Sequence, residues 1–322
     1  MEGAIAQPGR IDVHHHPTPP SYLEARGEDN RWAPAQRGWS VQKSLEDMEK
    51  GGVATSILSL PHSVHTWPGD AGKVNVGEGR RLARDWNEFM VKMARDHKGR
   101  FGVFAALPIL DIEGSLKEIE HSFDTLKVDG VTLMTNIGDK WLGDEHYAPV
   151  FAELHRRNAI VYTHPVAPDC CRGVLPEFND SVIEYGTDTT RAIAKLLFTG
   201  AAAKYSGIRF IFSHAGGTMP YLAERFQRAH QFSKMDLKKN VPDGVVPALN
   251  KFYYDSAQAA HAHAMSSFRT VIRLSQLLFG TDFPYRTAEE TARGLAECGC
   301  LSADELRAVD RENAVRLMPQ LR

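Results

Sequence analysis

Two histidines near the start of the chain have the spacing of a metal-binding pair. The segment IDVHHH at residues 11–16 joins apolar and β-branched residues to three consecutive histidines. In a β-strand, side chains two residues apart point to the same face, so His14 and His16 would point together and His15 away from them. Imidazole is a common ligand of divalent cations. The pair alone is moderately specific, because a short histidine run can also be a solvated surface feature.

Three further ionisable residues end apolar runs that are typical of buried strands. His164 ends the run IVYTH, His214 ends FIFSH, and Asp282 ends LFGTD. An imidazole or carboxylate at the end of an apolar run costs stability unless it is paired or binds a metal. A lone histidine of this kind is more often structural, but four strand ends that supply His-x-His, His, His and Asp predict a cation site.

Short apolar runs alternate along the chain with longer stretches of helical period. The predicted strands are Arg10–Val13, Val53–Leu60, Phe101–Leu107, Gly130–Thr135, Ala159–Thr163, Ile208–Ser213, Phe252–Asp255 and Gln276–Gly280. The predicted helices are Val41–Lys50, Glu78–His97, Glu113–Leu126, Tyr147–Arg156, Thr189–Tyr205, Pro220–Gln231, Ala262–Arg273, Ala288–Glu297 and Ala303–Leu317. Parallel strands need crossovers of helical length. Eight such units favour an α/β fold with one closed (β/α)8 TIM-like barrel domain over residues 1–322.

The loops that follow the strands are expected to form the active-site face of this barrel. Three long irregular segments, Pro17–Gly38, Pro61–Gly77 and Pro165–Asp188, each follow a predicted strand directly. Neither a G-x-G-x-x-G nor a Walker A pattern follows any strand, which argues against a nucleotide-binding alternative.

Composition excludes several classes of partner. The formal net charge of −2 gives no electrostatic reason to expect nucleic acid or a membrane surface. No apolar run approaches the roughly 20 residues of a membrane span, and the N-terminal segment lacks the pattern of a signal peptide, so a cytoplasmic protein is expected. The cysteines at 170, 171, 298 and 300 make a poor disulfide framework and are expected to be reduced; without CxxC spacing, a redox or metal role for the adjacent pair is disfavoured.

The motifs at strands one, five, six and eight resemble those of the amidohydrolase superfamily. The closer resemblance is to its non-oxidative decarboxylases, which act on aminocarboxymuconate semialdehyde, γ-resorcylate or 6-methylsalicylate. The segments that carry it are IDVHHHPTPPSYLEA, THP, FSHAGGTMPYLAERF, FGTDFPY and RENAVRLM, which together span nearly the whole chain.

This resemblance implies one divalent metal, with zinc favoured over manganese, held by His14, His16, His164 and Asp282. It also implies that His214 lies beside the metal and acts as an acid or base or orients a water molecule. Binuclear members of the superfamily use a carbamylated lysine, whereas the fourth strand here ends at Thr135 without a lysine. One metal is therefore expected, with His214 and Asp282 as the catalytic residues.

Three other residues are candidates for contact with the substrate. Arg225 lies eleven residues after His214, where the muconate-semialdehyde decarboxylases place an arginine that reaches a carboxylate in the neighbouring subunit. That spacing implies a homodimer or larger homo-oligomer; a solvated helix arginine is the alternative. His62, more than His65, and Tyr285 follow predicted strands and would face the same site.

The resemblance predicts a carbon–carbon lyase that releases CO₂ from an aromatic, hydroxybenzoate-like or muconate-type carboxylic acid. Either Asp282 or His214, acting through water, would deliver the proton that replaces the carboxylate. The same residues could instead support hydrolysis of a lactone or amide, or hydration of an unsaturated diacid. A metal-binding barrel without activity is the non-enzymatic alternative, since a fold alone does not prove a chemistry.

Overall fold

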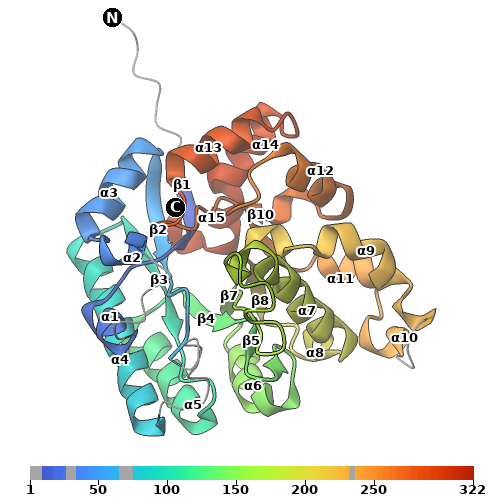
Figure 1. Ribbon diagram of the computed structural model, residues 1–322, viewed down its shortest axis with the longest axis horizontal. Coiled ribbons are helices and arrows are strands. Elements are labelled where there is room, and N and C mark those ends of the chain that lie inside the picture. Colours follow the sequence, from blue (N-terminus) through green and yellow to red (C-terminus); the bar gives the residue numbers. More distant parts are fainter. Residues whose placement is uncertain (1–8, 27–33, 65–74, 232–235) are drawn as a thin grey trace, which may run out of the picture.

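The computed structural model describes residues 9–26, 34–64, 75–231 and 236–322, and it forms a (β/α)8 barrel (Figure 1). One eight-stranded sheet has the order β1-β2-β3-β4-β7-β8-β9-β10, and its neighbouring strands pair in parallel. The strands are β1 (Arg10–His15), β2 (Val53–Leu58), β3 (Phe101–Ala106), β4 (Gly130–Met134), β7 (Ile160–His164), β8 (Arg209–Phe212), β9 (Tyr253–Asp255) and β10 (Leu277–Leu278).

Backbone hydrogen bonds close the barrel between its first and last strands. The Val13 amide donates to the Phe279 carbonyl at 3.0 Å, and the Asp282 amide donates to the His14 carbonyl at 2.9 Å. A third bond runs from the His16 amide to the chain just after Asp282. The closure therefore places the two ends of the chain that carry predicted metal ligands side by side.

Helices cover the outside of the barrel. They are α1 (Pro20–Arg26), α2 (Pro34–Arg37), α3 (Val41–Lys50), α4 (Val76–Asp96), α5 (Ile112–Glu120), α6 (Ala148–Arg156), α7 (Glu184–Phe198), α8 (Ala201–Lys204), α9 (Met219–Gln227), α10 (Leu237–Asn240), α11 (Val245–Leu249), α12 (Ala262–Val271), α13 (Ala288–Glu297), α14 (Ala303–Arg307) and α15 (Asn313–Leu317). Several begin at side-chain caps, and Ser302 and Glu305 form a capping box at the start of α14.

All eight predicted strands are present with ends shifted by a few residues, and every predicted helix has a counterpart. The predicted helix Thr189–Tyr205 is divided at Gly200 into α7 and α8, and the predicted helix Ala303–Leu317 is divided into α14 and α15. The structure also contains short elements that were not predicted. Helices α1 and α2 lie in the segment Pro17–Gly38 that was expected to be irregular, and α10, α11 and the two-stranded hairpin β5 (Asn136–Ile137) and β6 (Lys140–Trp141) lie in other connections. The hairpin is held by a fully buried carboxylate on α7, because Asp188 accepts hydrogen bonds from Asn136 and Trp141. Sequence periodicity has no signal for elements this short.

The core has two parts, as expected for a barrel. An inner cluster of strand residues includes Ile11, Ile57, Phe104, Tyr162 and Leu278, and side chains of α15 pack against it. A larger cluster fills the layer between the strands and the outer helices. The inner cluster is a packed floor beneath the mouth, so ionisable side chains at the strand ends lie above an apolar interior.

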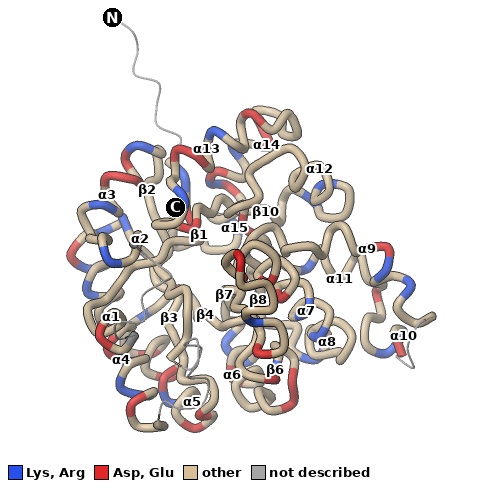
Figure 2. The backbone as a smooth tube through the Cα atoms, in the orientation of Figure 1, with Lys and Arg blue, Asp and Glu red and all other residues tan. Residues whose placement is uncertain are grey.

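The outer surface carries charges of both signs. Lys and Arg are interspersed with Asp and Glu over the outer helices (Figure 2). Among the described residues, no helix is both long and apolar enough to cross a bilayer.

Asp47 provides a test of how α3 is joined to α13. Its buried carboxylate accepts a hydrogen bond from the Ala288 amide at the start of α13, and burial raises the pKa of Asp47 from 3.8 to about 6. The folded state therefore binds more protons than the unfolded state between these values, so this group lowers stability as pH rises from about 4 to 6.

We expect Asp47→Asn to keep the bond to the Ala288 amide and to abolish that pH-dependent loss. The wild type should lose on the order of 1 kcal/mol over this range after solvent screening is allowed for. Urea unfolding of both proteins between pH 4 and 8 measures the difference. If the unfolding free energies of the two proteins depend on pH in the same way, ionisation of Asp47 does not destabilise the folded state, and the expectation is wrong.

Candidate metal centre and active site

A bulge at the end of β1 turns His14 into the mouth of the barrel. β1 has three steps between Asp12 and His15 where its partner β2 has two. Such an extra residue re-aims the side chains beside it. Val13 belongs to the inner core, and the next ring, that of His14, also lies inside the barrel, 5.3 Å from the ring of Tyr162.

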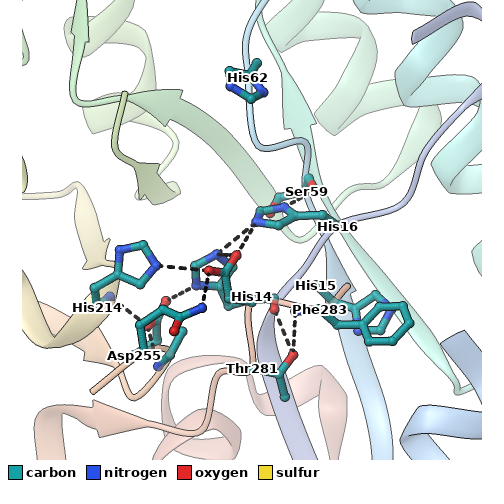
Figure 3. Close-up of polar contacts among 12 residues, drawn as sticks. His14, His15, His16, Ser59, His62, His214, Asp255, Thr281 and Phe283 are labelled. Atoms are coloured by element: carbon teal, nitrogen blue, oxygen red, sulfur yellow. Dashed lines mark hydrogen bonds and ion pairs between the residues drawn. The ribbon is translucent and has the colours of Figure 1, made fainter. Parts of the chain in front are cut away.

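His14, His16 and His214 point toward one another, whereas His15 points the opposite way (Figure 3). His15 is fully buried against α3, where its ring stacks on Phe283 with centroids 4.6 Å apart. The prediction that His14 and His16 share a face and that His15 points away is confirmed.

One nitrogen or oxygen each from His14, His164, His214 and Asp282 lies within 4.8 Å of the others, a group that could hold a metal ion. His16 is adjacent to this group, because its Nε2 lies 2.9 Å from His14 Nε2 and 3.2 Å from Asp282 Oδ1. The structure thus brings together all five residues that the strand-end motifs singled out. The choice of His16 or His214 as a ligand stays a prediction.

Two of the imidazoles are held in the orientation that metal ligands need. His16 Nδ1 donates to the Ser59 carbonyl at 2.9 Å, which leaves the lone pair on Nε2. His14 Nδ1 donates to Asp255 Oδ2 at 2.9 Å, which likewise frees its Nε2. Hydrogen bonds of this kind fix the tautomer and raise the basicity of a ligating histidine.

Asp255, at the end of β9, is a site residue that the sequence analysis did not single out. It is fully buried and accepts hydrogen bonds from His14, from the Tyr162 hydroxyl at 3.0 Å and from the His214 amide at 2.9 Å. The signal was present, since Asp255 ends an apolar strand as Asp282 does. Asp255 therefore positions one histidine by its ring and another by its backbone.

The electrostatics of the site favour a positive charge at its centre. Burial lowers the pKa of His14, but Asp255 and Asp282 outweigh it and raise the pKa to about 10. Burial lowers the pKa of His16 and of His164, so these two imidazoles are neutral and each has a nitrogen lone pair available for a metal ion. Burial alone would raise the pKa of Asp282, yet the neighbouring histidines hold it well below its usual value. Two buried carboxylates thus face two neutral imidazoles and a protonated His14, whose proton a divalent cation would replace.

Three buried polar atoms at this centre make no well-formed hydrogen bond to a described residue: His164 Nδ1, His214 Nε2 and Asp282 Oδ1. Of these, Asp282 Oδ1 lies 3.2 Å from the Nε2 atoms of His14 and His16. Buried polar atoms in native proteins are normally paired, so each exception needs an explanation. A cation bound by His164 and Asp282 would satisfy two of these residues, and His214 Nε2 lies 3.5 Å from Asp282 Oδ2. The residues present therefore fit the divalent metal that the motifs implied.

Strained backbone is concentrated at the same strand ends. Non-glycine residues with positive φ include His214 at 55°, Gln258 at 54° and Asp282 at 71°. Such conformations are uncommon and cluster at functional sites. The Gln258 side chain in turn donates to Asp282 Oδ2 at 3.0 Å, while Oδ1 of the same carboxylate faces the imidazoles of the site.

Glycine 280 leaves the room that this arrangement needs. A Cβ at Gly280 would lie 2.8 Å from the Cβ of Asp255 and 3.1 Å from that of His14, closer than side chains tolerate. The glycine in the LFGTD motif therefore lets β10 approach the pair that orients the first histidine.

A cavity of about 700 Å³ opens over these residues. His164, His214 and Asp282 lie in its lining, and so do His62 and Tyr285, two of the predicted substrate contacts. The loop after β7 supplies a large part of the wall: Val166, Ala167, Arg172, Asn179, Asp180, Ser181 and Val182.

Arg225 is absent from the described lining and is exposed on α9. Its contact with a neighbouring subunit's substrate stays a prediction. His65 lies outside the described residues. All four cysteines are free, as expected.

We expect Asp255→Asn to weaken metal binding about 10- to 100-fold, because the amide cannot match the carboxylate as partner of His14. Competition with a chromogenic chelator measures the dissociation constant. Tyr162→Phe is the matched control, since it removes a different hydrogen bond to Asp255 and leaves that of His14. Equal metal affinity in wild type and D255N would contradict the positioning role.

The chain is similar in sequence to fungal decarboxylases. The sequence profile of the amidohydrolase family matches residues 11–319. Decarboxylase yanB of Aspergillus niger is 32% identical, with 97% of this chain and 88% of that protein aligned. The 6-methylsalicylic acid decarboxylase of Penicillium expansum is 31% identical, with 97% of each chain aligned.

Solved structures with the same fold include an amidohydrolase II, with a TM-score of 0.86, 26% identity and coverage of 96% of this chain and 99% of that one. A dihydroxybenzoic acid decarboxylase from Polaromonas sp. JS666, solved with bound manganese, has a TM-score of 0.80, 21% identity and 98% coverage of each chain. With the strand-end histidines and aspartate in place, the chain belongs to the amidohydrolase family and groups with its metal-dependent, non-oxidative decarboxylases.

Proposed function

We propose that this protein removes the carboxyl group of a small hydroxybenzoate-like acid as CO₂, with one bound divalent metal and no redox cofactor. The observation that carries the proposal is the convergence of His14, His16, His164 and Asp282 beneath a cavity, in a chain whose relatives are decarboxylases. A muconate-type acid is the other substrate that the family suggests.

The size and lining of the cavity support a single-ring acid. Its volume of about 700 Å³ lies within the usual range for small-molecule sites. Tyr185 and Tyr285 line it together with aliphatic side chains of the β7 loop, so an aromatic ring would meet both aromatic and apolar surface. Among named relatives, 6-methylsalicylic acid is the acid that we place first for assay.

We infer that zinc is the metal, because three imidazoles and one carboxylate are ligands that zinc favours. Manganese is the second candidate, and it is the ion bound in the Polaromonas decarboxylase structure. When bound, either ion would polarise a substrate oxygen and stabilise negative charge that develops there.

The proton that replaces the carboxylate would come from the pair formed by His214 and Asp282. His214 Nε2 lies 3.5 Å from Asp282 Oδ2, and both residues line the cavity. Oδ1 of Asp282 faces His14 and His16 at 3.2 Å. Oδ2, which also accepts a hydrogen bond from Gln258, is the oxygen placed for proton exchange with His214. A proton held on this pair is transferred to the ring carbon that bears the carboxylate. The carbon–carbon bond then breaks, its electron pair restores the aromatic ring, and CO₂ leaves.

We also propose that the enzyme is a homodimer or a larger homo-oligomer. Arg225 is exposed on α9, one turn beyond Tyr221, whose side chain is 85% exposed. An exposed tyrosine and arginine on one helix are residue types enriched at protein interfaces. Their position supports, for this chain, the cross-subunit role that the spacing of Arg225 implies.

Metal removal gives the direct test of the proposed reaction. We expect chelated protein to lose CO₂ release from 6-methylsalicylate by about 100-fold or more, and added zinc or manganese to restore it. His164→Ala should lose activity and metal together, whereas His230→Ala, on the exposed surface, should keep both. If the protein opens lactone rings and releases no CO₂ from any acid tested, the proposed decarboxylase function is wrong and the hydrolase alternative is supported.

A further inference from the structure

Among the described residues, the wall of the cavity carries one arginine, Arg172, which no sequence motif singled out. Arg172 lies on the loop between β7 and α7 and belongs to the lining of the cavity that also contains His164 and Asp282. We propose that Arg172 binds the carboxylate of the substrate within the same subunit, while the metal side of the pocket takes the neighbouring ring oxygen. This inference rests on the proposed function.

Contacts with neighbouring residues hold the Arg172 side chain in place but involve only one of its three nitrogens. Its Nη2 donates to the Ala167 carbonyl at 3.0 Å and lies 3.4 Å from Asp169 Oδ1. Both contacts involve the same nitrogen, and among the described residues Nε and Nη1 have no partner. The side chain is 27% exposed. The loop therefore orients a guanidinium group and leaves most of its donors free for a ligand.

The charges of the cavity lining make Arg172 important for binding a carboxylic acid. Arg172 is the only Lys or Arg among the described residues that line the cavity, whereas Asp180 and Asp282 also line it. A guanidinium presents parallel N–H donors that match a carboxylate in a bidentate pair. Without Arg172, Asp180 would repel an acid on that wall. The neutral decarboxylated product gains nothing from the arginine.

The reaction also predicts at which stage the contact acts. The negative charge of the carboxylate disappears when CO₂ forms, so a salt bridge to it stabilises the bound substrate more than the later transition state. Contacts that weaken along the reaction are seen in KM more than in kcat. Arg172 is thus a binding residue, distinct from the proton-transferring pair.

The experiment compares equilibrium binding of an acid and of its decarboxylated product. The ligands are 6-methylsalicylate and 3-methylphenol, titrated into zinc-loaded wild type and Arg172→Gln by calorimetry, or by competition where turnover interferes. We expect R172Q to weaken binding of the acid about 10- to 100-fold and that of the phenol less than about twofold. Arg172→Lys keeps the positive charge but loses the paired N–H donors of the guanidinium, so its affinity for the acid should lie between those of wild type and R172Q.

In steady-state kinetics, R172Q should raise KM by a similar factor and change kcat little. Asp169→Asn is the matched loop control, because it removes the competing carboxylate and should bind the acid as tightly as wild type or more tightly. Equal losses for acid and phenol, or a loss in D169N as large as in R172Q, would mean that the loop is merely structural. Unchanged acid binding in R172Q would also overturn the proposal, and weaker acid binding in Arg225→Gln would then assign the carboxylate to that residue.

The proposed function and this inference fail in different ways. If wild type releases no CO₂ from any acid, decarboxylation is wrong, but the comparison of acid and phenol still measures whether Arg172 recognises a carboxylate. If CO₂ is released and R172Q binds the acid normally, only the role of Arg172 is lost.

Discussion

The burial of two carboxylates among four imidazoles is the constraint on which the rest of the site depends. Asp255 and Asp282 lie on either side of the His14 ring. Asp255 Oδ2 is 2.9 Å from His14 Nδ1, and Asp282 Oδ1 is 3.2 Å from His14 Nε2. Burying uncompensated negative charge is costly, so such a cluster persists only with matching positive charge and hydrogen bonds. A proton on His14 supplies part of that charge, and a divalent cation supplies all of it. The donor set, the unpartnered atoms and the strained backbone at Asp282 follow from this requirement.

The barrel meets the requirement by bringing distant parts of the chain to one edge. The closure between β1 and β10 puts His14 beside Asp282, and the bulge in β1 turns His14 inward. Behind the site, Asp12 accepts hydrogen bonds from the Thr281 amide and hydroxyl, which joins the strand of the histidines to the loop of Asp282. The scaffold thus orients the ligands through hydrogen bonds of its own, and rigid ligands of this kind select geometry as well as charge.

Much of this arrangement was predictable because it is periodic. Alternating apolar strands and amphipathic helices predicted the barrel, and the ionisable residues at four strand ends predicted which side chains would meet. Asp255 carries the same signal, but it stands alone on its strand end and has no accompanying motif. Arg172 could not be predicted, because its position depends on the course of an irregular loop, and loops without periodicity leave no pattern in the sequence. The bulge that re-aims His14 is likewise set by strand pairing rather than by residue type.

The choice between His16 and His214 is the most direct test of the account, because it separates a metal ligand from a catalytic neighbour. Anomalous diffraction from crystals of the zinc-loaded enzyme would locate the ion. We predict one peak per chain, about 2.0–2.2 Å from nitrogens of His14, His16 and His164 and from an oxygen of Asp282. His214 should lie outside coordination distance. A peak coordinated by His214 in place of His16, or two peaks in one site, would contradict the account.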